Sequence, residues 1–410
     1  MKKALRTSIL ALVRILGTPG AQQARRHATQ LHEPLRILLI RPDHLGDLIM
    51  VTPVLQAIKD QLPTAHITMM VGPWSREVVA RQPAVDDLLI CPFPGFQRAA
   101  QNPLTPYTLL VQTAQQLRQG QYDIAINLRP DFWWGAALLY LARVPLRIGY
   151  AIEPGTPFLT HALPFPSMPE HATVSNLWLV SAGLQASGHT PLTEPFDPEH
   201  YPLTFVPTDA ERLWVQQRLT QAGITAEKPL VVIHAGTGGA VKLWRMDGWA
   251  TIADQLLDTQ LLPPSTQIIL TGGKQEQALV DEIARHMTHQ PVILTDMTIG
   301  QMAALLKRAQ LVLGVDNGPL HFAAAQNTPS LRLFGPTDTR IFGPWGTATR
   351  HRVLAATHPC AGCPFIPCGR LDFSAEELPD HPCVRNISNH QMIEAVSALI
   401  KMVPIDISPG

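Results

Sequence analysis

The feature that most constrains the fold is an alternation of short apolar runs with helical patterns, which occurs twice along the chain. In the first half, strands are predicted at 35–40, 67–71, 88–90 and 124–128, and helices at 47–60 and 75–81. Strands that alternate with helices are typical of a parallel sheet with helices on both of its faces.

The second half repeats this pattern. Strands are predicted at 230–234, 267–270, 292–294, 311–313 and 331–334, and helices at 248–257, 275–287, 299–307 and 320–326. A final helix is predicted over 388–402, because Ser388 and Gln391 form a capping-box pattern before a run of apolar residues at helical spacing.

A proline-dense stretch, 153–207, separates the two halves and predicts loop, short helix and linker. The length of 410 residues also exceeds what one hydrophobic core usually supports. We therefore place the boundary near Pro207, with an N-terminal domain at 35–206 and a C-terminal domain at 207–410. The predicted fold class is α/β: two Rossmann-like, doubly wound parallel-sheet domains that face each other across a ligand-binding cleft.

Residues 1–34 form a basic, amphipathic arm ahead of the first domain. The basic residues that precede the first acid, Glu33, are Lys2, Lys3, Arg6, Arg14, Arg25 and Arg26. The pattern indicates either an arm that lies on an anionic membrane surface or a loosely docked N-terminus. Arg14 interrupts the apolar run and argues against a signal peptide. We expect a cytoplasmic protein, peripheral on the inner face of the plasma membrane. The 32 basic and 32 acidic residues argue against a nucleic-acid partner.

The first predicted strand runs into a turn that carries Asp43, Gly46 and Asp47. Gly46 permits a tight turn, and Asp47 stands at a helix start at the open end of the sheet, where an activated hydroxyl can reach it. The alternative is that Asp47 only caps the helix. Asp43 is a second carboxylate that can take either part.

Two segments of the second half favour binding of a nucleoside diphosphate. The loop 235–239, with Thr237 and Gly238, precedes Lys242, and exposed amides next to a lysine can hold a diphosphate. Glu276 follows the next strand and can accept hydrogen bonds from a ribose. The alternatives are a solvated loop lysine and an acid that only complements a helix dipole.

The strongest local signal is the segment 314–321, in which a strand runs into a Gly-Pro turn and a helix of small residues. It carries Asp316, Asn317, Gly318 and His321. Amides at such a helix start can face a phosphate, and the polar side chains lie at the same rim. Polar residues at several successive strand ends indicate a binding site.

In this order, the motifs LGDLIMVTPVLQAIK, VIHAGTGG followed by Lys242, GVDNGPLHFAAA and LFGPTD resemble those of the heptosyltransferases of glycosyltransferase family 9. The resemblance covers the chain from Arg36 to about Met402. It implies the GT-B fold, with Asp47 as catalytic base, Lys242 on the donor diphosphate, Glu276 on the ribose, and the turn from Asp316 to His321 on the phosphates.

The reaction implied by this resemblance is an inverting glycosyl transfer that needs no catalytic metal. Asp47 would take a proton from the acceptor hydroxyl, and Lys242 with the amides near Gly318 would stabilise the departing diphosphate. The expected partners are a nucleoside-diphosphate sugar, with an ADP-sugar and a heptose favoured by the family name, and a glycan or glycolipid acceptor of lipopolysaccharide biosynthesis. Asn317 and Ala235 depart from the residues common in the family.

Four of the five cysteines lie late in the chain, within a loop at 358–385. They are Cys360, Cys363, Cys368 and Cys383. Four grouped thiols indicate a structural Zn²⁺ or iron–sulfur site, with two disulfides or free thiols as the alternatives. In either case the loop is expected to fasten the last helix and to take no part in catalysis.

Two other functions fit the same fold. A nucleotide-sugar epimerase of GT-B type needs no acceptor, but the carboxylate of Asp47 favours one. A non-catalytic nucleotide- or carbohydrate-binding protein is disfavoured because Asp47, Lys242 and Glu276 are all present. A nicotinamide dehydrogenase is disfavoured because no G-x-G-x-x-G follows either candidate strand.

Overall fold

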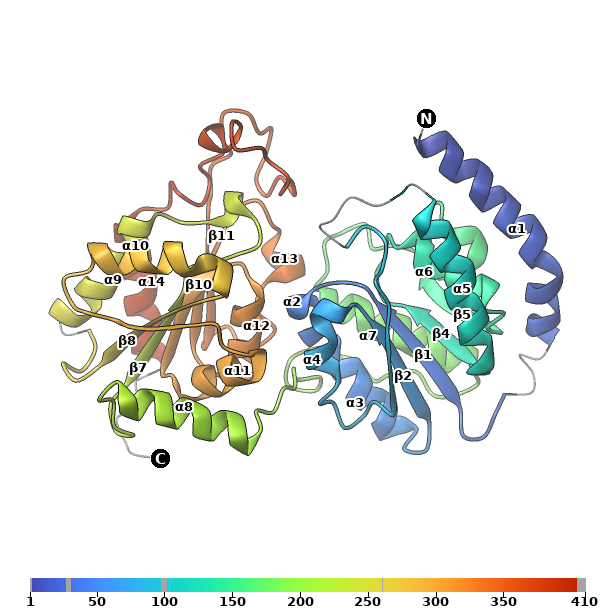
Figure 1. Ribbon diagram of the computed structural model, residues 1–410, viewed down its shortest axis with the longest axis horizontal. Helices are drawn as coiled ribbons and strands as arrows, with labels where there is room; N and C mark the ends of the chain where they lie inside the picture. The colour runs from blue at the N-terminus through green and yellow to red at the C-terminus, as the bar shows by residue number, and fades with distance from the viewer. Residues whose placement is uncertain (1, 27–30, 97–101, 103, 260, 404–410) are drawn as a thin grey trace. The chain divides into compact units, whose positions relative to one another are not determined.

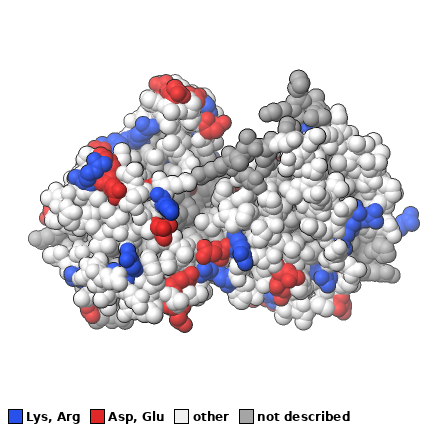
Figure 2. Space-filling model, viewed as in Figure 1, with Lys and Arg blue, Asp and Glu red and all other residues white. Residues whose placement is uncertain are grey.

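The computed structural model describes the whole chain except residues 1, 27–30, 97–101, 103, 260 and 404–410 (Figure 1). The chain divides into two compact units, Met1–Tyr201 and Pro202–Gly410. Charged side chains of both signs are scattered over the face drawn in Figure 2, in keeping with the formal net charge of zero.

The first unit is built on a six-stranded sheet in the order β3-β2-β1-β4-β5-β6. All of its strand pairs are parallel. The strands are β1 (Arg36–Arg41), β2 (His66–Val71), β3 (Asp87–Ile90), β4 (Ile124–Asn127), β5 (Leu146–Tyr150) and β6 (His161–Leu163). The helices are α1 (Lys2–Arg26), α2 (Leu45–Ile49), α3 (Thr52–Gln61), α4 (Arg76–Val79), α5 (Thr105–Gln119), α6 (Trp133–Leu141) and α7 (Ala172–Ala186).

The second unit repeats this architecture with the order β12-β11-β10-β7-β8-β9, again parallel throughout. The strands are β7 (Leu230–His234), β8 (Gln267–Gly272), β9 (Val292–Thr295), β10 (Leu311–Val315), β11 (Ser330–Phe334) and β12 (His351–Ala355). The helices are α8 (Asp209–Gln221), α9 (Met246–Asp258), α10 (Gln277–His286), α11 (Ile299–Arg308), α12 (Gly318–Ala325), α13 (Thr339–Phe342) and α14 (Asn389–Met402).

These sheets confirm the predicted fold class of two Rossmann-like parallel-sheet domains. The central strands are almost entirely buried, as expected for strands covered by helices on both faces. In the first unit, Leu38 and Ile40 of β1 belong to a buried cluster with residues of α5 and α6. In the second, Val231 and Ile233 of β7 pack with residues of α9 and α10.

Numbered along the chain within each unit, the strands of both sheets lie in the same order, 3-2-1-4-5-6. The first three strands are added toward one edge of the sheet, and the chain then returns past the first strand to build the other half. In the first unit this switch point lies between β1 and β4, and in the second between β7 and β10. Ligands of open parallel sheets bind outside the carboxyl ends of the strands at such a point. The loops after β1, β4, β7 and β10 are therefore where the fold places a binding site.

Two predictions about helices were wrong. The single helix predicted at 47–60 is two helices, α2 and α3, because Pro53 lacks an amide hydrogen and occupies the first turn of α3. The stretch 153–207 was predicted to hold no long element, yet it contains the 15-residue helix α7. Its prolines lie on either side of a proline-free window from 170 to 190, which leaves room for the helix.

The N-terminal arm contains the helix α1, which lies beside α6 (Figure 1). Residues 27–30 of the arm, and the side chains of Lys2, Lys3 and Arg25, lie outside the described residues. Within the described part of the chain, no helix combines the length and the apolar character that crossing a membrane requires. The final helix α14 begins with the predicted capping box of Ser388 and Gln391.

Candidate functional site

The first unit presents two carboxylates just after β1. Asp43 lies in the loop, and Asp47 lies in the first turn of α2, which starts after His44. The Asp47 side chain is 28% exposed, and its Oδ1 lies 3.5 Å from a guanidinium nitrogen of Arg41. Gly46 is half-buried beside it. An accessible carboxylate, oriented by one arginine at the switch point, is suited to accept a proton from a bound hydroxyl.

Asp43 has a different environment. Its side chain is only 5% exposed and forms ion pairs with Arg41, at 2.6 Å, and with Arg129 from the loop after β4. Burial alone would lower the pKa of Arg129, but the charges of Asp43 and Asp131 outweigh it and raise that pKa. Asp43 thus ties the ends of β1 and β4 together. Of the two carboxylates that the sequence left open, Asp47 is the more exposed.

The second unit brings Lys242 and Asp316 together. Lys242 ends a short 3-10 helix, Ala240–Lys242, and its Nζ lies 3.2 Å from Oδ2 of Asp316, the residue that follows β10. Thr337 donates a hydrogen bond of 2.7 Å to the same carboxylate oxygen. The Thr237 hydroxyl donates to the Asp316 carbonyl at 3.2 Å. The ammonium is therefore held at the carboxyl ends of β7 and β10, where a diphosphate can replace or join its carboxylate partner.

Asn317 fixes the start of α12. Its Oδ1 accepts the amide of Leu320 at 3.1 Å, and its Nδ2 donates to the carbonyl of Gly236 at 2.8 Å. The side chain thus caps α12 and ties the loop after β7 to the loop after β10. Its hydrogen bonds serve the fold, so we interpret Asn317 as a residue that positions the helix start. Gly318, half-buried, is the first residue of α12, where backbone amides have no partner within the helix.

Glu276 lies at the end of the short helix Lys274–Glu276 that follows β8. One carboxylate oxygen accepts the amide of Gly273 at 2.7 Å and lies 3.7 Å from Nε2 of His234. His234 is buried, and its Nδ1 lies 3.0 Å from the hydroxyl of Thr271. Burial lowers the pKa of His234, with the charge of Glu276 opposing that shift. Glu276 keeps a side-chain exposure of 25% and is open to a ligand.

His321 is buried against Arg332, a cation that was not predicted from the sequence. Arg332 of β11 is fully buried; its Nη1 lies 3.3 Å from Nδ1 of His321, and its Nη2 donates to the carbonyl of Leu320 at 2.6 Å. Burial lowers the pKa of Arg332 to about 9, against the opposing charge of Asp316, so the guanidinium remains protonated at neutral pH. A charged residue inside the apolar run 331–334 was the signal that could have identified it.

These residues create a positively charged surrounding for a phosphate. Lys242, Arg332 and the start of α12 bring positive charge to the ends of β7 and β10, and Asp316 contributes one negative charge. Such a fixed arrangement can stabilise negative charge without reorganisation. The structure thus brings together Thr237, Lys242, Asp316, Asn317 and Gly318, with His321 beneath them, and holds Glu276 at the end of the neighbouring strand.

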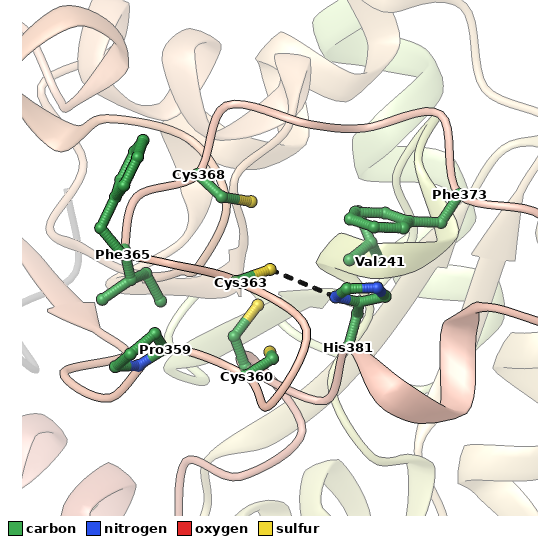
Figure 3. Close-up of a pocket in the computed structure, with 10 residues that line it drawn as sticks. Val241, Pro359, Cys360, Cys363, Phe365, Cys368, Phe373 and His381 are labelled. Carbon is green, nitrogen blue, oxygen red and sulfur yellow. Dashed lines mark hydrogen bonds between the residues drawn. The ribbon is translucent and has the colours of Figure 1, made fainter.

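The late cysteines also converge. One ligand atom each from Cys360, Cys363 and His381 lies within 4.8 Å of the other two, and Cys363 Sγ is 3.3 Å from Nδ1 of His381. Cys368 lines the same small cavity, of about 10 Å³, and Figure 3 shows its side chain on the side of Cys363 and Cys360. All five cysteines of the chain are free. The pKa of Cys383 is raised to about 12, mainly by burial and also by the neighbouring thiol of Cys360.

These groups fit a soft metal ion. Thiolates and an imidazole at this spacing are the ligands that Zn²⁺ and iron take in structural sites. The group differs from the predicted set of four cysteines by including His381, which comes from the other end of the loop. The sequence places His381 beside Cys383, but only the fold brings it back to the first cysteine pair.

Comparison with known proteins connects these features to a family. The sequence matches "Glycosyltransferase family 9 (heptosyltransferase)" over residues 110–364. It is 27% identical to lipopolysaccharide heptosyltransferase 3 of Escherichia coli over 309 residues, 73% of this chain and 83% of that protein. It is also 27% identical to lipooligosaccharide heptosyltransferase 2 of Haemophilus ducreyi over 319 residues, 74% of this chain and 84% of that protein.

Solved structures agree on the fold. A family 9 glycosyl transferase from Veillonella parvula superposes with a TM-score of 0.70 at 22% identity, covering 90% of this chain and 98% of that one. The ADP-heptose heptosyltransferase II of E. coli gives a TM-score of 0.66 at 20% identity, covering 90% of this chain and 99% of that one. The predicted GT-B fold is confirmed.

Proposed function

The chain belongs to glycosyltransferase family 9, and from this premise we propose that it moves a heptose from ADP-heptose to a glycolipid acceptor of lipopolysaccharide biosynthesis. That the protein is a glycosyltransferase follows from the family. The heptose and the acceptor are supported by the names of the relatives, which include lipopolysaccharide heptosyltransferases. The observation that carries the chemistry is an accessible carboxylate, Asp47, in the first unit and the ammonium of Lys242, held beside Asp316, in the second, each at the switch point of its own sheet.

We propose a single displacement with Asp47 as general base. The carboxylate takes the proton of the acceptor hydroxyl while the oxygen attacks the anomeric carbon. The new glycosidic bond forms on the face opposite the breaking bond to the diphosphate, so the configuration at that carbon inverts. The carboxylate leaves the step protonated, and the nucleoside diphosphate leaves with the bonding electron pair. Arg41, 3.5 Å from Asp47, orients the carboxylate for this role.

On the donor side, the departing diphosphate is proposed to bind Lys242 and the amides at the start of α12. Lys242 now pairs with Asp316 at 3.2 Å, and the arriving phosphate would compete for the ammonium. Arg332, fully buried behind His321, supplies a second fixed cation. Fixed cations stabilise the charge that develops on the leaving group, which supports a reaction without a catalytic metal.

Glu276 is proposed to recognise the ribose of the donor. Its carboxylate is held by the amide of Gly273 at 2.7 Å and is one-quarter exposed, which leaves lone pairs for sugar hydroxyls. Thr237 and Gly238 line the loop over which the diphosphate would lie, and His321 and Asn317 would shape the turn beneath it. Gly46 would allow the acceptor hydroxyl to approach Asp47 closely.

An assay of sugar transfer tests this function. The purified protein is incubated with ADP-heptose and a lipopolysaccharide-core glycolipid that lacks the added heptose, with and without EDTA. We expect a product whose anomeric configuration is inverted relative to the donor, formed equally well with EDTA. Conversion of the nucleotide sugar without acceptor would favour the epimerase instead. Binding of ADP without any turnover would favour a non-catalytic protein.

We also propose that Cys360, Cys363 and His381 hold a structural Zn²⁺ or iron, with Cys368 or Cys383 as a fourth ligand. The bound metal would cross-link the loop that precedes α14 and would take no part in the sugar transfer. Elemental analysis of the protein as purified is expected to find one metal site, which Cys363→Ser removes together with part of the thermal stability. Metal-free protein with four late thiols that all react with a thiol reagent would contradict the proposal.

The proposed metal site fits a cytoplasmic location, because grouped cysteines are more often metal ligands than disulfides in a reducing compartment. We propose that the protein works at the inner face of the plasma membrane. Labelling of intact and permeabilised cells with a membrane-impermeant thiol reagent distinguishes this location from a secreted one.

A further inference from the structure

One face of the helix α1 packs against the rest of the first unit. Leu10, Ala21 and Ala24 are buried in the first unit. The hydroxyl of Tyr140 on α6 donates to the carbonyl of Arg14 at 2.9 Å. At Gly17 the helix approaches α6 so closely that a Cβ would lie 2.4 Å from the Tyr140 ring. The orientation of α1 about its own axis is therefore fixed by this contact.

The opposite face of α1 carries an apolar stripe, formed by Leu12, Ile15 and Leu16. Their exposed fractions are 54%, 69% and 71%. The spacing of three and four residues places them on one side of the helix. On α5, Leu104 at its start and Val111 are also exposed, at 57% and 48%. Large apolar side chains gathered in this way on a surface mark an interaction site.

The charged residues of α1 and of the two helices next to it are all basic. The sequences of α1, α5 and α6 contain no Asp or Glu, although the whole chain has equal numbers of acidic and basic residues. Arg14 on α1 is exposed. Arg118, at the end of α5, has a lowered pKa. Burial is the larger cause, and the nearby positive charge of Arg143 adds to it. Figure 2 shows blue but no red side chains at the edge that α1 covers.

α1 does not seal against α5. A cavity of about 380 Å³ lies between them, lined by apolar side chains of both helices and by Arg118 and Arg143. An occupant of this surface must therefore bring hydrocarbon to the stripe and the cavity, and negative charge to the arginines. Phospholipids with anionic headgroups combine both in the required order, because their charge lies at the surface of a hydrocarbon layer.

We propose that α1, together with the exposed side of α5, is a docking surface for an anionic lipid bilayer, with α1 lying in the interface plane. Leu12, Ile15 and Leu16 insert among the acyl chains, and Arg14, Arg118 and Arg143 contact the headgroup phosphates. This inference does not depend on the transferase reaction, since α1 contains none of the residues assigned to donor or acceptor. Docking of α1 would hold the enzyme at the membrane that contains its proposed glycolipid acceptor.

Vesicle co-sedimentation of the full chain tests the proposal. The protein is mixed with vesicles of phosphatidylglycerol and phosphatidylcholine, or of phosphatidylcholine alone, at low and high salt. We expect binding to the anionic vesicles that weakens with salt and is much poorer with phosphatidylcholine alone. Equal binding to both vesicle types, or to neither, would overturn it.

Two substitutions on the stripe, Leu12→Asp and Leu16→Asp, have matched controls on the other unit. Leu213, 53% exposed, matches Leu12 at 54%, and Val206 matches Leu16, both at 71%. Each stripe variant is expected to lower vesicle partitioning by about tenfold or more, because an inserted leucine contributes more than a tenfold factor. Leu213→Asp and Val206→Asp should bind as the wild type does. Full binding by the stripe variants would overturn the proposal.

Two further readouts separate lipid docking from other roles of the stripe. Arg14→Gln should weaken anionic-vesicle binding by about fivefold, in line with one cation near a charged surface. Transfer to a detergent-free, soluble acceptor should be unchanged in Leu16→Asp, since α1 carries none of the residues assigned to the donor or the acceptor. A dimer in light scattering that Leu16→Asp converts to a monomer would show that a second copy covers the stripe, and would overturn the proposal.

Discussion

Replacing Gly236 by alanine should weaken nucleotide binding without unfolding the protein. Gly236 follows β7 and is buried next to the Glu276 carboxylate. A Cβ at this position would lie 2.1 Å from Cδ of Glu276, a separation that no real pair of atoms adopts without bonding. The obstacle is the end of a flexible side chain, so the expected response is that Glu276 rotates away from its present place.

Two costs follow from that rotation. The amide of Gly273 loses its carboxylate partner at 2.7 Å, a partly exposed bond whose loss costs about 1 kcal/mol of stability. The donor ribose loses its proposed hydrogen bonds to a charged acceptor, which contribute about 1.5–3 kcal/mol. The second cost corresponds to a roughly 10- to 100-fold weaker affinity for ADP. The effect on binding should therefore exceed the effect on folding.

Isothermal titration of ADP into Gly236→Ala measures this directly, with Gly239→Ala as the control. A Cβ at Gly239, three residues along the same loop, would meet only the Lys242 side chain, at an ordinary contact distance of 3.6 Å. We expect only the first variant to lose affinity. Wild-type affinity in Gly236→Ala would refute the ribose role of Glu276. An equal loss in both variants would assign the effect to the loop backbone.

Three further predictions concern single side chains. Lys242→Ala should weaken ADP binding and slow transfer about tenfold or more, with Lys242→Arg retaining part of both, and normal ADP binding by the alanine variant would exclude a phosphate role. Burial and the charges of Arg332 and Arg350 lower the pKa of His351 from 6.5 to about 3, so the unfolded chain takes up a proton that the folded protein excludes. The free energy of unfolding should thus fall by about 2 kcal/mol between about pH 7.5 and about pH 5 through this residue alone, and urea denaturation of His351→Gln should lack that part of the slope. Asp43→Asn should cost about 3 kcal/mol of stability, because Arg41 and Arg129 lose the buried carboxylate that they share and each keeps only a more exposed acid nearby, whereas a loss below about 1 kcal/mol in thermal unfolding would contradict a structural role.

Most strands were predictable because both faces of each sheet are buried, but β5, β6 and β12 were not predicted. A strand such as β7 is an almost uninterrupted apolar run in the sequence. Helices such as α11 and α14 begin with capping boxes. The helix α7 was not predicted because the whole stretch 153–207 was treated as proline-rich, although residues 170–190 contain no proline. The break between α2 and α3 was missed because helical periodicity continues across it, and only Pro53 marks the new start.

The candidate site was predictable only where one segment carries several of its groups. Asp316, Asn317 and His321 lie in one turn and were found together, and their strand-end position identified them. The partners that decide their roles come from elsewhere: Arg332 lies on the neighbouring strand, and Arg129 reaches Asp43 from the loop after β4. Contacts between distant segments depend on strand order, which a single sequence does not specify.

The central claim is that a carboxylate on the N-terminal unit activates the acceptor while the C-terminal unit alone binds the nucleotide. The most direct test compares Asp47→Asn with the wild type in one experiment that records both ADP affinity and the turnover of heptose transfer. The amide preserves the size of the side chain but cannot take up the proton. The account predicts that turnover falls by at least about a hundredfold while ADP affinity stays within about twofold of the wild type. Turnover close to that of the wild type, or a parallel loss of ADP affinity, would contradict it.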